Sequence, residues 1–193
     1  AAHASAPFNS LSEMMAYANA QPGGLAFASP GNGTLNHLTG ERFAFETRTK
    51  MLHVPYKGGA PAGAAIASGE VPVGLVAASS AIAFIKSGRA KAIAVTAARR
   101  IPLGPDWPTV AESGVPGFVA SNWVAMVAPA GTPRDIIGKI NADANRALKL
   151  PDVRERLAAV GAEAVGSTPE ELATRIRDDS ERYGKTVGLL KLK

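Results

Sequence analysis

Residues 25–40 have the sequence LAFASPGNGTLNHLTG, in which a short apolar segment leads through a Gly-rich turn into a helical pattern. An apolar segment of this length, followed by small turn residues, is typical of a buried strand that leads into a helix. Two similar units follow, with apolar segments at 51–55 and 71–76, turns at 56–59 and 77–80, and helices at 60–68 and up to Lys86. The start of the chain is therefore expected to repeat a strand–turn–helix unit.

These repeated units predict a sheet of parallel strands. A helix is expected at 10–20, before the units, and a further strand at 92–96, after them. Short apolar strands separated by helices are typical of a parallel sheet that is covered by helices on both faces. The sequence therefore predicts the α/β class, with a doubly wound parallel sheet.

A connector rich in Pro and Gly, at 99–117, interrupts this pattern. Neither a helix nor a central strand tolerates such a composition, so we expect residues 1–118 to form a complete α/β lobe that includes the connector. Residues 119–193 are expected to hold an extended segment up to 127, helices at 134–148, 151–160 and 168–184, and a short strand at 162–165. Their apolar stripes need a sheet of more than two strands to cover them, so residues 119–193 look incomplete on their own.

Composition and charge exclude several classes of protein. The 193 residues include no Cys, which excludes disulfides, thiolate zinc sites, iron–sulfur clusters and a Cys nucleophile. The net charge is +5, but the cations are dispersed and aromatic residues make up only 6%, so we expect no nucleic-acid partner. No apolar run approaches the roughly 20 residues of a membrane span. The first residues do not have the pattern of a secretory signal.

Polar residues gather in three turns, at 29–34, 56–61 and 78–80. In an open parallel sheet such turns lie at the carboxyl ends of the strands, where helix N-termini present unpaired N–H groups and a positive dipole end. That arrangement suits an anion, although ordinary capped turns would have the same composition. Hydroxyls come from Ser29, Thr34, Ser79 and Ser80, an amide from Asn32, and a cation from Lys57 beside two glycines.

Motifs for catalysis or for cofactor binding are not expected. The turn from Gly31 has two glycines of the dinucleotide-binding motif but Asn36 in place of the third, and Lys57 precedes its glycines, unlike a Walker A lysine. His37 and His53 are expected to be ordinary histidines of a helix and a strand. No predicted strand end carries Asp or Glu, so a general base or metal site has no evident members. We expect binding without reaction, with no catalytic residue, metal or cofactor.

Six segments together resemble the solute-binding proteins of tripartite tricarboxylate transporters, the Bordetella-type uptake family. Their order and spacing agree along essentially the whole chain. They are LAFASPGNGTLNHLTG at 25–40, HVPYKGGAPA at 53–62, IKSGRAKAIAVT at 85–96, WPTVAESGVPGF at 107–118, VAPAGTP at 127–133 and GAEAVGSTPEE at 161–171.

The resemblance implies a periplasmic, two-lobed protein with a fold like that of type II periplasmic binding proteins. Such a protein captures a small organic carboxylate without catalysis and delivers it to membrane transporter subunits. The third turn, at 77–80, lacks the Asp or Asn with Pro that is common in the family, so the identity of the carboxylate stays open. By this similarity the ligand-binding residues are Ser29, Asn32, Gly33, Thr34, Lys57, Gly58, Gly59, Ala60, Ala78 and Ser79.

Members of that family are longer than this chain, which resembles one whole lobe and the tail of the other. Residues 119–193 are therefore expected to find further sheet partners, for instance by homodimerisation. Two other functions stay open. One is the effector-binding domain of a transcription regulator, which would need a helix-turn-helix upstream. The other is a small α/β enzyme for an anionic substrate, which would need a base or nucleophile at a strand end.

Overall fold

The computed structural model describes residues 1–190, and the side chains of residues 1–188. The chain forms two compact units, Ala1–Asn122 and Trp123–Lys193, which we call unit 1 and unit 2. Among the described residues, no helix combines the length and the apolar character that crossing a membrane requires.

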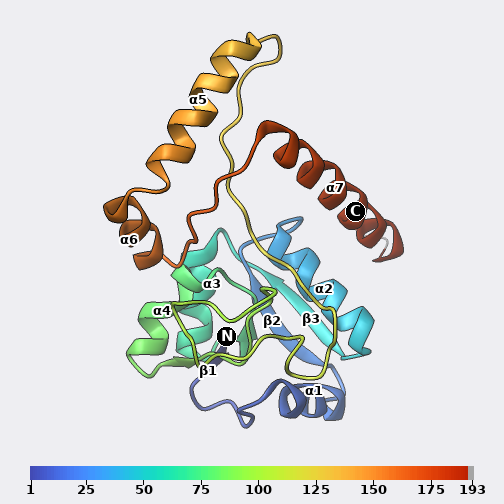
Figure 1. Ribbon diagram of the computed structural model, residues 1–193. Helices are drawn as coiled ribbons and strands as arrows, with labels where there is room; N and C mark the ends of the chain where they lie inside the picture. Colours follow the sequence, from blue (N-terminus) through green and yellow to red (C-terminus); the bar gives the residue numbers. More distant parts are fainter. Residues whose placement is uncertain (191–193) are drawn as a thin grey trace. The chain divides into compact units, whose positions relative to one another are not determined.

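A five-stranded sheet with the strand order β3-β2-β4-β1-β5 forms the centre of unit 1 (Figure 1). β2 pairs in parallel with β3 along its whole length, from Leu25 opposite Met51 to Ser29 opposite Pro55, and it also pairs in parallel with β4. The predicted α/β class with parallel strands is confirmed. The strands are β1 Ala2–His3, β2 Leu25–Ser29, β3 Met51–Pro55, β4 Val73–Gly74 and β5 Ala90–Lys91.

The other side of the sheet differs from the prediction. β1 pairs antiparallel with both β4 and β5, so the sheet is mixed. β1 has two residues, too few to show any periodicity in the sequence. The prediction of a strand at 92–96 is wrong: β5 ends at Lys91, and Val95 forms only an isolated bridge with Thr109 in the connector.

Helices cover both faces of the sheet, as the sequence predicts for a doubly wound domain (Figure 1). Phe27 of β2 packs in one apolar cluster with residues of α1, α2 and the Pro-rich connector. Its neighbour Ala28 packs in the other cluster, with residues of α3 and α4. The helices of unit 1 are α1 Leu11–Ala20, α2 Leu35–Thr47, α3 Gly59–Ser68 and α4 Ala78–Lys86.

Two glycines let the helices that follow the turns pack closely against neighbouring elements. A Cβ on Gly40 of α2 would lie 2.3 Å from the Phe27 ring of β2, so α2 can lie this close to the sheet only with glycine at that position. A Cβ on Gly63 of α3 would lie 2.5 Å from the carbonyl oxygen of Ser80 in α4. A backbone atom cannot move aside as a flexible side chain can. The helices α3 and α4 therefore pack this closely only because residue 63 has no Cβ.

Unit 2 consists of helices and extended segments. Its helices are α5 Arg134–Ala147, α6 Pro151–Ala159 and α7 Pro169–Leu190. The prediction of a strand at 162–165 is wrong: these described residues have no regular secondary structure. The capping residue of α5 is Pro133, and the Thr132 hydroxyl donates to the carbonyl oxygen of Pro129 at 2.8 Å.

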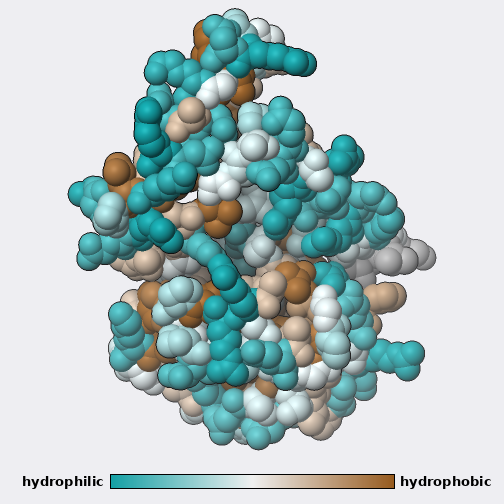
Figure 2. All heavy atoms as spheres, viewed as in Figure 1, coloured by the Kyte–Doolittle hydropathy of each residue, from teal (hydrophilic) through white to brown (hydrophobic). Residues whose placement is uncertain are grey.

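Unit 2 has little apolar core of its own. The described helices α5 and α6 contain no buried residue. Apolar residues of unit 2 are visible at the surface among hydrophilic ones (Figure 2), and Val124 is 99% exposed. Polar contacts link the segments instead: the indole N–H of Trp123 donates to Asp179 at 2.8 Å, and the side-chain amide of Asn141 donates to the carbonyl oxygen of Ser167 at 2.8 Å. That this segment belongs to an incomplete lobe stays a prediction.

Candidate functional site

The structure brings the three polar turns together at one edge of the sheet in unit 1. The amide of Gly58, in the second turn, donates to the carbonyl oxygen of Pro30 in the first, at 2.9 Å. A Cβ on Gly59 would lie 2.5 Å from the Ser80 hydroxyl oxygen, so the second turn also contacts the start of α4. The three turns lie together because β2 pairs in parallel with β3 and β4, which puts the carboxyl ends of these strands at the same edge of the sheet.

Two neighbouring helices at this edge begin without a side-chain cap. The capping residue of α3 is Gly58, with φ +112°, and that of α4 is Ala77; at neither of these described positions does a side chain accept a hydrogen bond from the helix. The first amides of a helix have no acceptor within it. The first N–H groups of α3, at Gly59 and Ala60, and of α4, at Ala78 and Ser79, are therefore donors that an anion could use.

The first turn uses most of its polar groups for its own structure. The Thr34 hydroxyl donates to the carbonyl oxygen of Gly31 at 2.8 Å and caps α2 by accepting from the amide of His37 at 3.3 Å. The amide of Gly33 donates to Nδ1 of His37 at 3.1 Å. Ser29 is fully buried, with its hydroxyl oxygen 2.6 Å from Nε2 of His53. These three candidate residues thus shape the turn.

Two exposed side chains offer polar groups to a ligand at the same edge. Asn32 is exposed at the tip of the first turn, and Lys57 is exposed in the second. Tyr56, next to Lys57, anchors the second turn, because its hydroxyl donates to Glu70 at 2.7 Å. Burial, this hydrogen bond and the charge of Glu70 raise the pKa of Tyr56 to about 12. An ammonium, an amide side chain and helix-start amides together favour an anionic guest.

Sequence reasoning missed the part that His37 and His53 play. Their rings stack with centroids 3.8 Å apart, and each ring contacts the first turn, His37 through Gly33 and His53 through Ser29. Burial lowers the pKa of His37, although the carboxylate of Glu41 opposes that shift. Burial and the neighbouring His37 lower the pKa of His53 to about 4. The pairing of Phe27 opposite His53 in the sheet, which no local pattern shows, brings the two histidines together.

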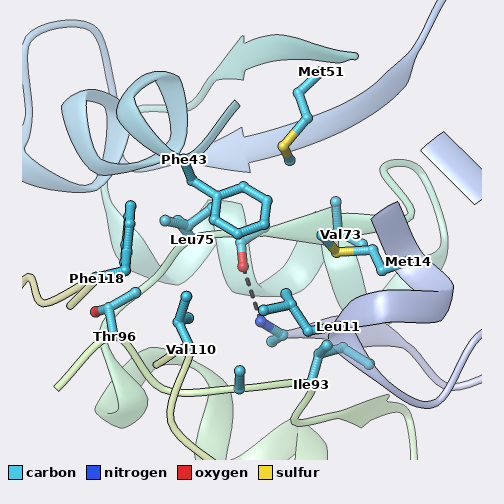
Figure 3. Close-up of a pocket in the computed structure, with 13 residues that line it drawn as sticks. Leu11, Met14, Phe43, Met51, Val73, Leu75, Ile93, Thr96, Val110 and Phe118 are labelled. Carbon is cyan, nitrogen blue, oxygen red and sulfur yellow. Dashed lines mark hydrogen bonds between the residues drawn. The ribbon is translucent and has the colours of Figure 1, made fainter. Parts of the chain in front are cut away.

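An apolar cavity of about 60 Å³ lies elsewhere in unit 1, between the sheet, α1 and the connector (Figure 3). Figure 3 shows Phe43, Leu11 and Val110 around it, with Thr96 at its edge. Its lining is almost entirely apolar, which does not suit a carboxylate, because an ion is poorly solvated in such surroundings. The cavity is therefore part of the packed core and separate from the three turns.

An α/β lobe with this strand order, in which helix N-termini converge beside the parallel strands, has the architecture of the periplasmic binding proteins of type II. The chain belongs to the family described as "Tripartite tricarboxylate transporter family receptor" (TctC), whose model matches residues 1–192. The family that the sequence motifs resemble is thereby confirmed. A curated relative from Pseudomonas sp. (strain P51), "UPF0065 protein in tcbD-tcbE intergenic region", is 36% identical over 181 residues, which cover 93% of this chain and 54% of the relative.

Solved structures show the same fold. The protein described as "R. palustris Rpa4515 with adipate" superposes with a TM-score of 0.90 at 29% identity, over 99% of this chain and 64% of that one. "MatC (Rpa3494) from Rhodopseudomonas palustris with bound malate" superposes with a TM-score of 0.78 at 31% identity, over 96% of this chain and 64% of that one. This chain therefore spans about half the length of the curated relative and about two thirds of these structures.

Proposed function

We propose that this chain is the ligand-binding part of an extracytoplasmic solute-binding protein that captures a small organic carboxylate. The observation that carries the proposal is the pair of uncapped helix starts, α3 and α4, which present four amides side by side. Family membership supports it, as do the descriptions of two structural neighbours, one with adipate and one with malate.

In this proposal the carboxylate oxygens accept hydrogen bonds from the amides of Gly59, Ala60, Ala78 and Ser79. Lys57 adds a positive charge, and Asn32 adds a side-chain amide from the first turn. Ser29, Gly33, Thr34 and Gly58 keep the turns in place. A helix N-terminus stabilises a negative charge by about 0.3–1 kcal/mol at an exposed site and by up to about 2 kcal/mol when it is partly buried.

Binding without reaction is the proposed outcome of this geometry. The polar groups at the site are backbone amides, the Asn32 amide, the Lys57 ammonium and the hydroxyls of Ser79 and Ser80, all of which can hold an anion by hydrogen bonds and charge alone. By the same family argument, we propose that the complete protein works in the periplasm and passes its ligand to the membrane subunits of a tripartite tricarboxylate transporter. Homodimerisation through the apolar residues of unit 2 remains part of the proposal.

A charge substitution at the helix starts tests the site. Ala60→Glu puts a carboxylate at the exposed second position of α3, where it competes with the ligand for the amides and repels it. We expect carboxylate binding, measured by calorimetry with adipate and with malate, to fall at least about tenfold. The helix itself should become more stable by about 0.3–1 kcal/mol, because the new charge interacts favourably with the dipole.

The matched control is Ala64→Glu, at an exposed position one turn further along α3. It adds the same charge to the same helix, but one turn away from the first amides, where it cannot compete for their hydrogen bonds, so it should weaken binding far less than Ala60→Glu does. Equal affinity of Ala60→Glu and the unmodified chain would show that these amides do not hold the ligand.

A further inference from the structure

His37 and His53 form a compact polar cluster directly beneath the first turn. Their rings are 3.8 Å apart and inclined by only 20°, and His37 is 7% exposed. Each ring holds the turn at a different atom: Nδ1 of His37 accepts from the amide of Gly33, and Nε2 of His53 lies 2.6 Å from the hydroxyl oxygen of Ser29. Two histidines from separate elements thus fix both ends of the same short segment.

The contact to Gly33 depends on the protonation state of His37. An imidazole nitrogen accepts a hydrogen bond only when it carries no proton, so Nδ1 of His37 is unprotonated in this arrangement. A proton added there would point at the N–H of Gly33, and two donors cannot share one hydrogen bond. The amide of Gly33 would lose its acceptor, and the turn would lose the hydrogen bond that ties its tip to α2.

A shared metal ion is a different use of the same cluster, because ligand atoms of His37, Glu41 and His53 lie within 4.8 Å of one another. The stacking argues against it. A metal lies close to the plane of each imidazole that binds it, and two nearly parallel planes 3.8 Å apart have no common point near both nitrogens. A metal bound at Nε2 of His37, the atom that faces Glu41, would also need the proton of the neutral ring on Nδ1, where it would break the hydrogen bond from the Gly33 amide.

We propose that the stacked pair His37–His53 is a pH-sensitive clamp that holds the turn 31–34 in place when both rings are neutral and releases it when His37 is protonated. The consequence for the carboxylate site rests on the proposed function. Asn32 lies at the tip of the clamped turn, so release of the turn makes Asn32 mobile and weakens carboxylate binding in acid.

The charges around the pair determine the direction of this effect. The titratable groups that face His37 are Glu41, on the same helix at 3.7 Å, and His53, on β3. β2 contributes Ser29 and Phe27, which carry no charge. Once protonated, His37 forms an ion pair with Glu41, so little positive charge is left to attract a ligand. The lost hydrogen bond to Gly33 is then the larger effect.

Nuclear magnetic resonance of the 193-residue chain tests the clamp without any ligand. The ring shifts of His37 report its protonation, and hydrogen-exchange protection of the Gly33 amide reports the hydrogen bond. Between about pH 7.5 and the acidic pH at which the ring shifts show that His37 is protonated, we expect protection of Gly33 to fall roughly tenfold. The Phe27 amide, in the middle of β2, serves as the internal reference and should stay protected. Gly33 that stays protected while His37 becomes protonated would overturn the proposal.

Two variants of His37 separate titration from structure. His37→Asn keeps an acceptor near the position of Nδ1 but does not titrate, so protection of Gly33 should be retained at both pH values. His37→Leu removes the acceptor, so protection should be low at both. The matched control His3→Asn changes a histidine outside the clamp and should behave like the unmodified chain. A fall in protection of Gly33 in His37→Asn on acidification would contradict the clamp.

Binding measurements connect the clamp to the site. Calorimetry with adipate and with malate should show a loss of affinity in acid that is at least about threefold larger for the unmodified chain than for His37→Asn, since titration of the ligand affects both equally. An equal loss in both would refute the link to binding. If neither carboxylate binds at either pH, the proposed function fails, while Gly33 protection still decides the clamp. Protection in acid that appears only with added Zn²⁺ would favour a metal site instead.

Discussion

Gly63 and Ser80 lie in direct backbone contact between α3 and α4: a Cβ on Gly63 would come within 2.5 Å of the Ser80 carbonyl oxygen and 3.2 Å of the Phe84 ring. This contact keeps the two uncapped helix starts side by side. Four amides can therefore face one ligand, although they belong to helices that are separated by a strand in the sequence.

Gly63→Ala should push α3 and α4 apart. Neither the carbonyl oxygen nor the adjacent helix can move away without shifting backbone, so we expect a loss of about 1–3 kcal/mol in the free energy of unfolding and weaker carboxylate binding. Urea denaturation measures the first effect. Gly59→Ala meets only the rotatable hydroxyl of Ser80 and should cost less. Gly138→Ala, in α5 with open space around it, should stabilise by up to about 1 kcal/mol.

Stability should fall as the pH drops from about 6.5 to about 4. Burial and His37 lower the pKa of His53 to about 4 in the folded chain, so the unfolded chain binds more protons between these values. The neutral His53 ring contributes its full stabilisation above about pH 6.5, the pKa of histidine in the unfolded chain. As the pH falls towards the folded pKa, the free energy of unfolding drops by about 1–2 kcal/mol for this partly exposed ring. Urea denaturation across this range should show a smaller loss for His53→Gln than for the unmodified chain. Equal slopes would contradict the assignment.

Val110→Ile should fill part of the apolar cavity. Val110 is buried and lines this space of about 60 Å³, which has room for one more methyl group (Figure 3). We expect a gain of about 0.5–1 kcal/mol in the free energy of unfolding. Val71→Ile is the control, because Val71 is equally buried but packs in the other cluster, away from the cavity. Val71→Ile should lower the free energy of unfolding. If Val110→Ile lowers it as well, the cavity cannot take the added methyl group.

Asp179→Asn should loosen the contact between the start of unit 2 and α7. Burial alone would raise the pKa of Asp179, but hydrogen bonds from Arg175 and Trp123 hold it below the ordinary range, so the carboxylate is charged. The neutral amide loses the charge-assisted bonds, at a cost of about 1–2 kcal/mol. The indole N–H resonance of Trp123 should shift and exchange faster. Asp178→Asn, on an exposed neighbour, should leave that resonance unchanged.

Local patterns in the sequence predicted most of the elements of unit 1. The strands at 25–29 and 51–55 are short, mostly apolar segments, and their bounds agree with β2 and β3. The prediction of a strand at 92–96 was wrong because an apolar segment that packs beneath the connector has the same composition as a strand.

The sequence by itself determined the α/β class, the family and the three polar turns, because strand–turn–helix units and their small residues are local features. Only the tertiary structure decided which polar groups in those turns are already hydrogen-bonded within the chain. Gly33 and Ser29 bond to the two histidines, whereas Gly59 and Ala78 begin helices with no side-chain cap. That division follows from the pairing of β2 with β3 and the packing of α3 on α4, contacts between residues far apart in the chain.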